Sequence, residues 1–195
     1  MTLKKILLKR STEDKMDKII AGLQLLLCNL NMLFYKIIYL GNISLPIKNL
    51  STHAPQIRIR NNGRLNLKNV KFRSGNFIFC DGGELNIGDG CFFNRNCSIN
   101  CVLNIKIGKN TIFGENVKIY DHNHDFSSEY IVSLTQMSSD NISIGSNCWI
   151  GTNVIILKGV TITNNVIISA GSIITKDILF PGVYTTSKLA LRKIK

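Results

Sequence analysis

Proline is scarce in this chain of 195 residues, with 3 Pro beside 15 Gly. This composition excludes polyproline and collagen-like structures, which need proline throughout their length. Acidic residues are also few, 12 against 24 Lys and Arg, so the formal net charge is +12. The charge favours an anionic partner but leaves open nucleic acid, a phosphate-bearing cofactor, an acidic glycan or a membrane surface. Because 45% of the residues are hydrophobic, a disordered polycation is excluded and one domain with an appendage is expected.

No pair of cysteines has the C-x-x-C spacing that zinc sites and redox dithiols use. The six cysteines are Cys28, Cys80, Cys91, Cys97, Cys101 and Cys148. The first residues reach acidic charge before any long apolar stretch, which argues against a secretory signal. We therefore expect reduced thiols and a cytoplasmic protein, with peripheral contact at the inner face of the membrane left open.

Residues 11–41 carry a helical pattern. Apolar residues lie alternately four and three apart at Ile19, Leu23, Leu26, Leu30, Leu33 and Ile37. Ser11 and Asp14 resemble a capping box, and Gly41 is placed to end the helix. The uncharged stretch 19–35 is shorter than the roughly 20 residues of a spanning helix, so spanning is not favoured. We favour a helix packed on its own domain or on a sister subunit. The alternative is a helix on an anionic membrane surface, suggested by Lys4, Lys5, Lys9 and Arg10.

The second half of the chain has a strict period of six. Isoleucine recurs at Ile144, Ile150, Ile156, Ile162, Ile168 and Ile174. Four residues after each of these come Cys148, Val154, Val160, Val166, Ser172 and Ile178. Neither a helix nor an ordinary strand has this period, which is typical of hexapeptide parallel β-helices.

The six-residue pattern extends upstream in two phases that differ by two residues. One phase comprises Ile87, Phe93, Ile99 and Ile105, and the other Ile107, Phe113 and Ile119. Cys91, Cys97 and Cys148 fall on small inward positions and are predicted to be buried. We expect a helical segment over 1–50, the β-helix over 51–180 with an inserted loop at 122–141, and a basic tail over 181–195.

Three hexads make a coil of 18 residues, so residues 18 apart are expected to stack. Thr152 then lies beside Ala170, Gly151 beside Ser169, and Lys158 beside Lys176. These rows predict a shallow track of small residues for a thin, phosphate-bearing chain. Alternatively, small residues merely suit tight corners and lysines keep an outer face soluble.

The hexads stop between Ile119 and Ile144, where a polar insertion opens with Asp121-His122-Asn123-His124-Asp125. Long interruptions of a regular scaffold are usually functional. With Ile119 and Asn123 inward, His122 and His124 are expected to project outward, where imidazole can transfer protons near neutral pH. A metal site is the rival interpretation, but no ligand spacing is recognisable, and no metal is expected.

The run Asp121 to His124, together with the runs 147–154 and 169–178, resembles the hexapeptide-repeat acyltransferases, most closely the sugar and polysaccharide O-acetyltransferases. The resemblance implies an all-β, left-handed parallel β-helix, a homotrimer with active sites between subunits, and acetyl coenzyme A along one prism edge. It implies His122 as catalytic base, with His124 as the other candidate, and Trp149 lining the donor and acceptor site. The implied coenzyme-binding positions are Trp149, Gly151, Thr152, Ala170, Thr175, Lys176 and Arg192.

The expected activity is acetyl transfer to a hydroxyl of a bacterial surface polysaccharide, capsule or lipopolysaccharide, or of its sugar precursor. One alternative is N-acetylation of a nucleotide-linked amino sugar, and another is a non-catalytic or metal-binding β-helix of the carbonic-anhydrase type. Nucleic acid is not expected as a partner, because no basic cluster is interleaved with aromatics. An acidic acceptor would suit a basic group in the early coils, although a solvated face explains it as well. That group comprises Arg58, Arg60, Arg64, Lys68, Lys71 and Arg73.

Overall fold

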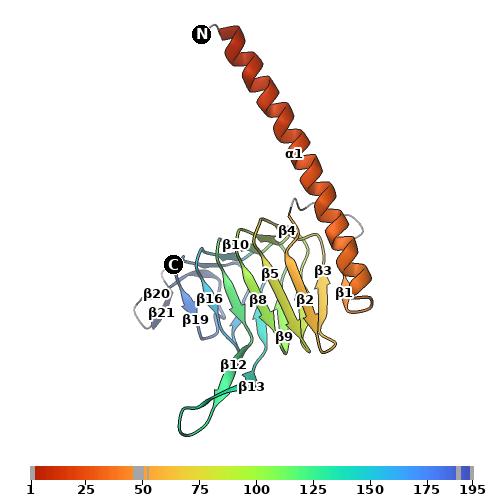
Figure 1. Cartoon of the computed structure of the whole chain (residues 1–195). Helices are drawn as coiled ribbons and strands as arrows, with labels where there is room; N and C mark the ends of the chain where they lie inside the picture. Colours follow the sequence, from red (N-terminus) through yellow and green to blue (C-terminus); the bar gives the residue numbers. More distant parts are fainter. Residues whose placement is uncertain (1–2, 46–50, 52, 188–189, 194–195) are drawn as a thin grey trace.

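The structure is a computed structural model that describes residues 3–45, 51, 53–187 and 190–193, with side chains from 16 to 186 within those ranges. Its body is a three-sided parallel β-helix, which confirms the predicted fold class (Figure 1). Each full coil contributes one strand to each of three sheets, here called faces A, C and B in the order that the chain visits them.

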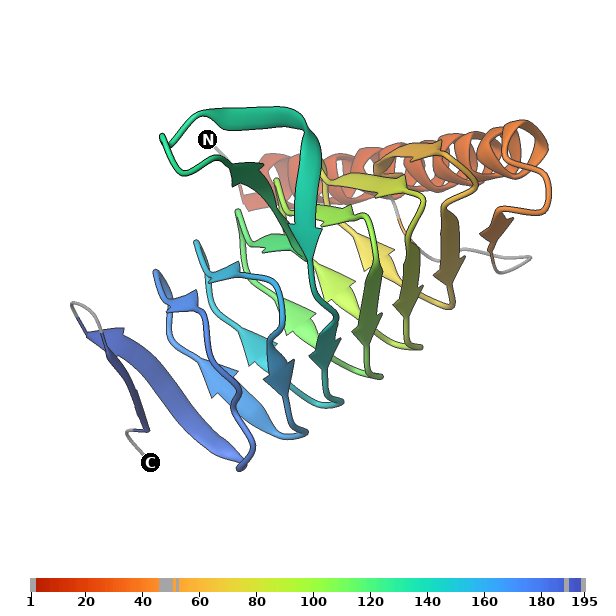
Figure 2. The ribbon, with the colours of Figure 1, turned by 90° about the horizontal axis from the view of Figure 1, so that it is seen from below.

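The three faces are built from short strands stacked in parallel, coil upon coil (Figure 2). Face A contains β1 (Ile43–Ser44), β3 (Arg64–Leu67), β6 (Glu84–Ile87), β9 (Asn104–Ile107), β14 (Ile142–Ile144) and β17 (Thr161–Ile162). Face B contains β2 (Gln56–Arg60), β5 (Phe77–Asp81), β8 (Ser98–Cys101), β11 (Lys118–Tyr120), β16 (Ile155–Ile156) and β19 (Ile173–Ile174). Face C contains β4 (Lys71–Phe72), β7 (Phe92–Phe93), β10 (Ile112–Phe113), β15 (Trp149–Ile150), β18 (Val166–Ile168), β20 (Gly182–Ser187) and β21 (Ala190–Lys193). The tail predicted over 181–195 therefore includes β20 and the antiparallel β21, which extend face C.

Coil length differs between the two halves of the β-helix. Trp149 pairs with Ile167, an offset of 167 − 149 = 18 residues, as the hexads predict. Upstream, Ile87 pairs with Ile107, an offset of 107 − 87 = 20 residues. The prediction that Ile105 continues the phase of Ile87 is therefore wrong, because Ile105 pairs with Leu85. The apparent two-residue shift reflects longer coils.

Asparagine shapes many of the corners. Asn96, Asn110, Asn116, Asn147, Asn153 and Asn165 all have φ between 56° and 60°. Asparagine tolerates this left-handed conformation better than other residues with a Cβ. The corner side chains also stack, and Asn116 Nδ2 donates to Asn153 Oδ1 at 2.7 Å. The abundance of asparagine is thus a property of the repeat.

The core is a column of inward side chains. Phe93 stacks on Phe113 with ring centroids 4.2 Å apart, and Phe72 follows on the other side of Phe93 at 5.3 Å. Cys91, Cys97 and Cys148 are buried, which confirms the prediction, and all six cysteines are free. Burial raises the pKa of the Cys91 thiol to about 11 and raises the pKa values of Cys97 and Cys148.

One long helix, α1 (Leu3–Ile38), precedes the β-helix and leaves it at an angle (Figure 1). The helix is confirmed, but the predicted capping box is wrong because α1 begins at Leu3 and Ser11 lies inside it. Gly41, with φ of +85°, lies in the turn that follows. The contact with the β-helix is made by Cys28 and Met32, both buried, whereas the predicted stripe from Ile19 to Ile37 is exposed.

Candidate functional site

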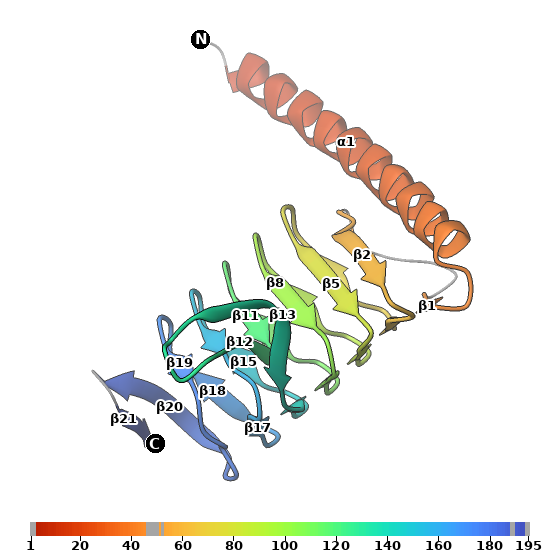
Figure 3. The same ribbon diagram turned by 60° about the horizontal axis from the view of Figure 1, so that its bottom comes forward.

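The inserted loop is a β-hairpin of β12 (His122–Phe126) and β13 (Val132–Ser139). It leaves the β-helix at the corner between faces B and A, where β11 ends at Tyr120 and β14 begins at Ile142. The hairpin extends away from the coils in Figure 1 and crosses in front of them in Figure 3. Two hydrogen bonds fix its base: Asp140 N donates to Asp121 O at 2.8 Å, and Lys158 Nζ donates to Ser138 Oγ at 2.8 Å.

Asp121 is the inward residue at the start of the hairpin. The prediction that Asn123 points inward is wrong, because Asn123 is exposed and Asp121 is completely buried. Strand β11 alternates Ile119 inward and Tyr120 outward, so Asp121 turns in before the chain leaves the coil. Its carboxylate accepts hydrogen bonds from the backbone N–H groups of Val102, at 3.0 and 3.1 Å, and Leu103, at 2.9 Å.

His122 is held by this buried carboxylate. Its Nδ1 lies 3.0 Å from Asp121 Oδ1, and its side chain is 16% exposed. A carboxylate only accepts hydrogen bonds, so Nδ1 carries the proton and Nε2 is the basic nitrogen of the neutral ring. Within the described part of the chain, Nε2 has no hydrogen-bond partner. Tyr120 meets the ring edge-on at a centroid distance of 6.4 Å. The pair has the arrangement of a general base and its orienting group.

His124 has a different environment. It is exposed, and its Nδ1 lies 3.1 Å from the backbone oxygen of Ser133 across the hairpin. A neutral carbonyl stabilises an imidazolium less than a carboxylate does. Both histidines project outward as predicted, but only His122 has a charged partner. The sequence reasoning missed Asp121 as the positioning group, although its place next to His122 was the available signal.

The predicted donor track lies at another corner of the same chain. Gly151, Thr152 and Ala170 form the corner between faces C and B, and the register of β15 with β18 stacks Thr152 beside Ala170. A Cβ at Gly151 would lie 2.6 Å from Ala170 N, so close backbone packing alone requires this glycine. Ala170 is exposed and Thr152 is half-buried.

The other predicted donor residues are spread over further parts of the surface. Thr175 and Lys176 follow β19 at the corner between faces B and A, and both are exposed. Lys158 stacks beside Lys176 in the predicted register, but its Nζ donates a hydrogen bond to Ser138 of the hairpin. Arg192 lies in β21, and its side chain is outside the described ones. One chain therefore does not bring His122 together with the small-residue track.

Trp149 lies on the outer side of face C and is 54% exposed. It stands in register between Ile112 on β10 and Ile167 on β18, which are 47% and 37% exposed. Phe92 and Val183 extend the same row on the outer coils. This outer row of five apolar residues is here called the face C stripe.

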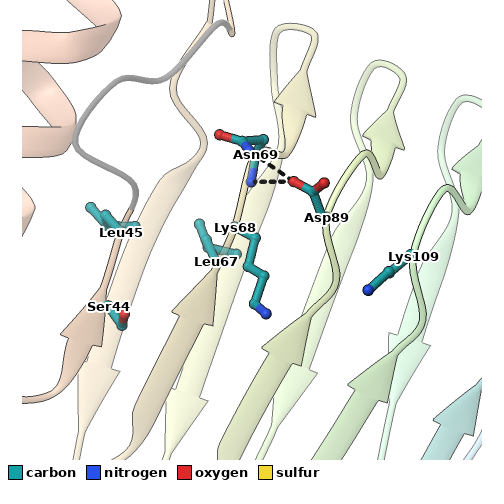
Figure 4. A pocket seen from close by; sticks show the side chains of 7 residues that line it. All are labelled: Ser44, Leu45, Leu67, Lys68, Asn69, Asp89 and Lys109. Carbon is teal, nitrogen blue, oxygen red and sulfur yellow. Dashed lines mark hydrogen bonds between the residues drawn. The ribbon is translucent and has the colours of Figure 1, made fainter.

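The basic group predicted for an acidic glycan does not form one surface. Arg58 and Arg60 lie on face B, Arg64 on face A and Lys71 on face C, so the charges surround the first coils. Lys68, Lys109 and Asp89 line a hollow of about 500 Å³ (Figure 4). The Asp89 carboxylate there accepts a hydrogen bond from Asn69 Nδ2 at 2.8 Å. Only part of this group can meet any one ligand.

Face B carries an outward row that ends beside the hairpin. Arg58, Phe79, Asn100 and Tyr120 stand in register on β2, β5, β8 and β11. Coils lie about 4.8 Å apart, so this row spans roughly 14 Å. The Arg60 guanidinium lies 5.9 Å from the Phe79 ring centroid. Tyr120 at the end of the row contacts His122.

Among the described residues, no group of three or more His, Cys, Asp or Glu side chains is suited to hold a metal ion.

Cys148 is 2% exposed, and its Sγ donates a hydrogen bond to Thr163 O at 3.2 Å. Burial raises the pKa of this thiol. An acyl-cysteine at this position would need an accessible thiolate, which the fold does not provide.

Residues 141–176 match the family model described as bacterial transferase hexapeptide (six repeats). Over 100 residues the chain is 39% identical to galactoside O-acetyltransferase of Escherichia coli K12, covering 51% of this chain and 49% of the relative. It is 31% identical over 117 residues to the putative lipopolysaccharide biosynthesis O-acetyl transferase WbbJ of the same organism, covering 54% and 59%. The match thus spans between half and three fifths of each relative.

The fold is shared with the hexapeptide-repeat acetyltransferase VCA0836 of Vibrio cholerae, solved with acetyl coenzyme A. The TM-score is 0.57 at 19% identity, with 95% of this chain and 89% of that chain covered. The strict hexads, the three-sided coil and the matched family model agree: residues 141–176 carry the bacterial transferase hexapeptide repeat, on a fold shared with a hexapeptide-repeat acetyltransferase.

Proposed function

We propose that this chain is an acetyl-coenzyme-A-dependent O-acetyltransferase that modifies a hydroxyl of a surface polysaccharide or of its sugar precursor. The observation that carries the proposal is the buried Asp121 carboxylate 3.0 Å from His122 Nδ1, at the mouth of the hairpin. The names of the two Escherichia coli relatives, a galactoside O-acetyltransferase and a putative lipopolysaccharide biosynthesis O-acetyl transferase, support the reaction class.

His122 acts as the general base in this proposal. A sugar hydroxyl is too weakly acidic to attack a thioester unaided at neutral pH. His122 Nε2 takes the hydroxyl proton as the oxygen attacks the acetyl carbonyl, and Asp121 stabilises the imidazolium that forms. When the tetrahedral intermediate collapses, the carbon–sulfur bond breaks and His122 returns the proton to the departing thiolate. The acetyl group ends on the sugar oxygen, and coenzyme A leaves as the thiol.

The active unit is proposed to be a homotrimer. His122 and the track of Gly151, Thr152 and Ala170 occupy different corners of one chain, so a neighbouring copy is needed to bring them together. The face C stripe provides apolar surface for such contact. In this arrangement Thr152 and Ala170 of one subunit flank the pantetheine arm beside His122 of the next. Thr175, Lys176 and Arg192 are proposed to lie near the phosphates.

The acceptor is proposed to approach along the outward row of face B. Phe79 and Tyr120 offer aromatic surfaces on which sugar rings pack, Asn100 offers hydrogen bonds, and Arg58 suits an acidic substituent. The row ends at Tyr120, next to the base. This geometry supports an extended glycan over a single small sugar.

Incubating the purified protein with labelled acetyl coenzyme A and a panel of acidic and neutral glycans tests this function. Mass spectrometry of the product should show one added acetyl group that mild alkali removes, as expected for an ester. An alkali-stable amide would instead support N-acetylation. Absence of transfer to any glycan or amino sugar would contradict an acyltransferase role.

A further inference from the structure

Helix α1 has two apolar faces that point in opposite directions. One face packs on the β-helix through Cys28 and Met32, which are 3% and 5% exposed, with Tyr35 and Tyr39 partly buried beside the core. The opposite face consists of Ile19, Leu23, Leu26, Leu30, Leu33 and Ile37, each between 54% and 66% exposed. Packing on the β-helix accounts for the apolar residues of the first face only.

The exposed face is broad. On one side it continues into further apolar residues, Met16, Ile20, Leu27, Phe34 and Ile38, each between 45% and 64% exposed. At 3.6 residues per turn these positions cover an arc of about 140°. The seam of a coiled coil is narrower than this arc. The width of the face therefore favours a lipid surface over a second copy of the helix.

The packing on the β-helix also decides between spanning the membrane and lying on it. By length and composition Met16–Ile38 could cross a membrane. However, Tyr35 Oη accepts a hydrogen bond from Ile57 N at 3.2 Å, and Cys28 and Met32 contact the core. A spanning helix surrounded by lipid would lose these contacts. A helix lying in the interface keeps them, because its packed side faces away from the bilayer.

Charge completes the pattern of an interfacial helix. On the helical wheel Lys18, Asn29 and Lys36 form one polar border of the exposed apolar face, and Gln24 and Asn31 form the other. Lys4, Lys5, Lys9 and Arg10 precede the apolar segment in the same helix. Basic residues of this kind strengthen attachment to anionic lipid.

We propose that α1 is a monotopic membrane anchor that lies in the headgroup region of an anionic bilayer with its exposed apolar face toward the acyl chains. The β-helix rests on the packed side of the helix, outside the bilayer. The hairpin leaves the β-helix on the side opposite the free end of α1, so the candidate site stays open to a soluble donor (Figure 1). The anchor holds the enzyme at a surface where glycans attached to lipid are presented.

Sedimentation with vesicles tests the anchor. The full chain should pellet with vesicles of phosphatidylcholine and phosphatidylglycerol, and less with phosphatidylcholine alone or at high salt. The triple variant L26Q/L30Q/L33Q should bind at least about tenfold more weakly, since it removes apolar surface that is exposed in the structure. The matched control L179Q/F180Q changes exposed apolar residues near the last coils and should bind like the wild type.

The basic segment is tested by K4Q/K5Q/K9Q/R10Q, which should lose the preference for anionic vesicles. Equal binding by the wild type and the Leu→Gln triple variant would overturn the anchor. So would a wild type that ignores both kinds of vesicle while the triple variant loses its oligomeric mass, because the exposed face would then contact another copy.

An environment-sensitive fluorophore distinguishes lying from spanning. All six native cysteines are buried, so a new cysteine can be labelled selectively. A probe at L30C on the exposed apolar face should shift to the blue on anionic vesicles, whereas a probe at Q24C on the polar border should shift little. Equal blue shifts at both positions would indicate a spanning helix and refute the monotopic arrangement.

Discussion

Asp121 Oδ1 lies 3.0 Å from His122 Nδ1, and the same carboxylate accepts the backbone N–H groups of Val102 and Leu103 in the preceding coil. The carboxylate is completely buried, whereas His122 reaches the surface. The imidazole is thereby anchored to the rigid β-helix although it belongs to a hairpin. This relationship is the basis of the proposed mechanism.

The substitution Asp121→Asn tests the positioning role. The amide preserves shape and one acceptor but can present its NH₂ group to His122, which favours the other tautomer. We expect kcat to fall by about 10²- to 10⁴-fold with a small change in KM. Steady-state kinetics over a pH series provide the measurement, and the conservative Asp121→Glu should recover part of the rate. If Asp121→Asn changed only thermal stability, the carboxylate would be purely structural.

Complementation between subunits tests the trimeric site. His122→Ala and Ala170→Trp should each be inactive, because one lacks the base and the other blocks the donor track. If each site uses His122 of one subunit and Ala170 of the next, co-expressed mixtures should regain about one quarter of wild-type activity, one half times one half. A mixture as inactive as its components would show that each chain builds its own site.

The aromatic column predicts where the fold is most sensitive. Phe93 is buried between Phe72 and Phe113, so Phe93→Ala leaves a cavity and should lower the free energy of unfolding by about 3–5 kcal/mol. Trp149→Ala removes a half-exposed ring and should cost far less. Urea unfolding of both variants provides the comparison. Equal losses would contradict the assignment of the core.

Thiol reactivity follows from burial. At pH 8, fewer than about one of the six thiols of the folded chain should react with Ellman's reagent. In the unfolded chain all six should react. Burial raises the pKa of Cys91 to about 11, so the folded protein keeps this thiol neutral where the unfolded chain ionises it. Between pH 9 and 11 the folded state should therefore lose stability, as unfolding curves across that range would show. A stability that rises in this range would contradict the assignment.

The hexads could be predicted because one inward position of each hexad from Ile144 to Ile174 is isoleucine, at a fixed interval of six. The 20-residue coils could not, since their longer strands, such as β8 and β9, leave Ile105 on the six-residue interval from Ile87 although Ile87 pairs with Ile107. The inward turn of Asp121 depends on the backbone groups of Val102 and Leu103, which lie 19 and 18 residues earlier. The orientation of α1 could not be predicted from the sequence, because the helix has two apolar faces. The burial of Cys28 and Met32 shows which face packs on the β-helix.

The central claim is that His122, held by Asp121, is the base, and paired alanine substitutions at the two hairpin histidines test it most directly. Initial rates of acetyl transfer from acetyl coenzyme A should fall at least about 10²-fold in His122→Ala. They should remain within about threefold of wild type in His124→Ala, whose Nδ1 faces only a backbone oxygen. Full activity in His122→Ala, or a larger loss in His124→Ala, would contradict the account.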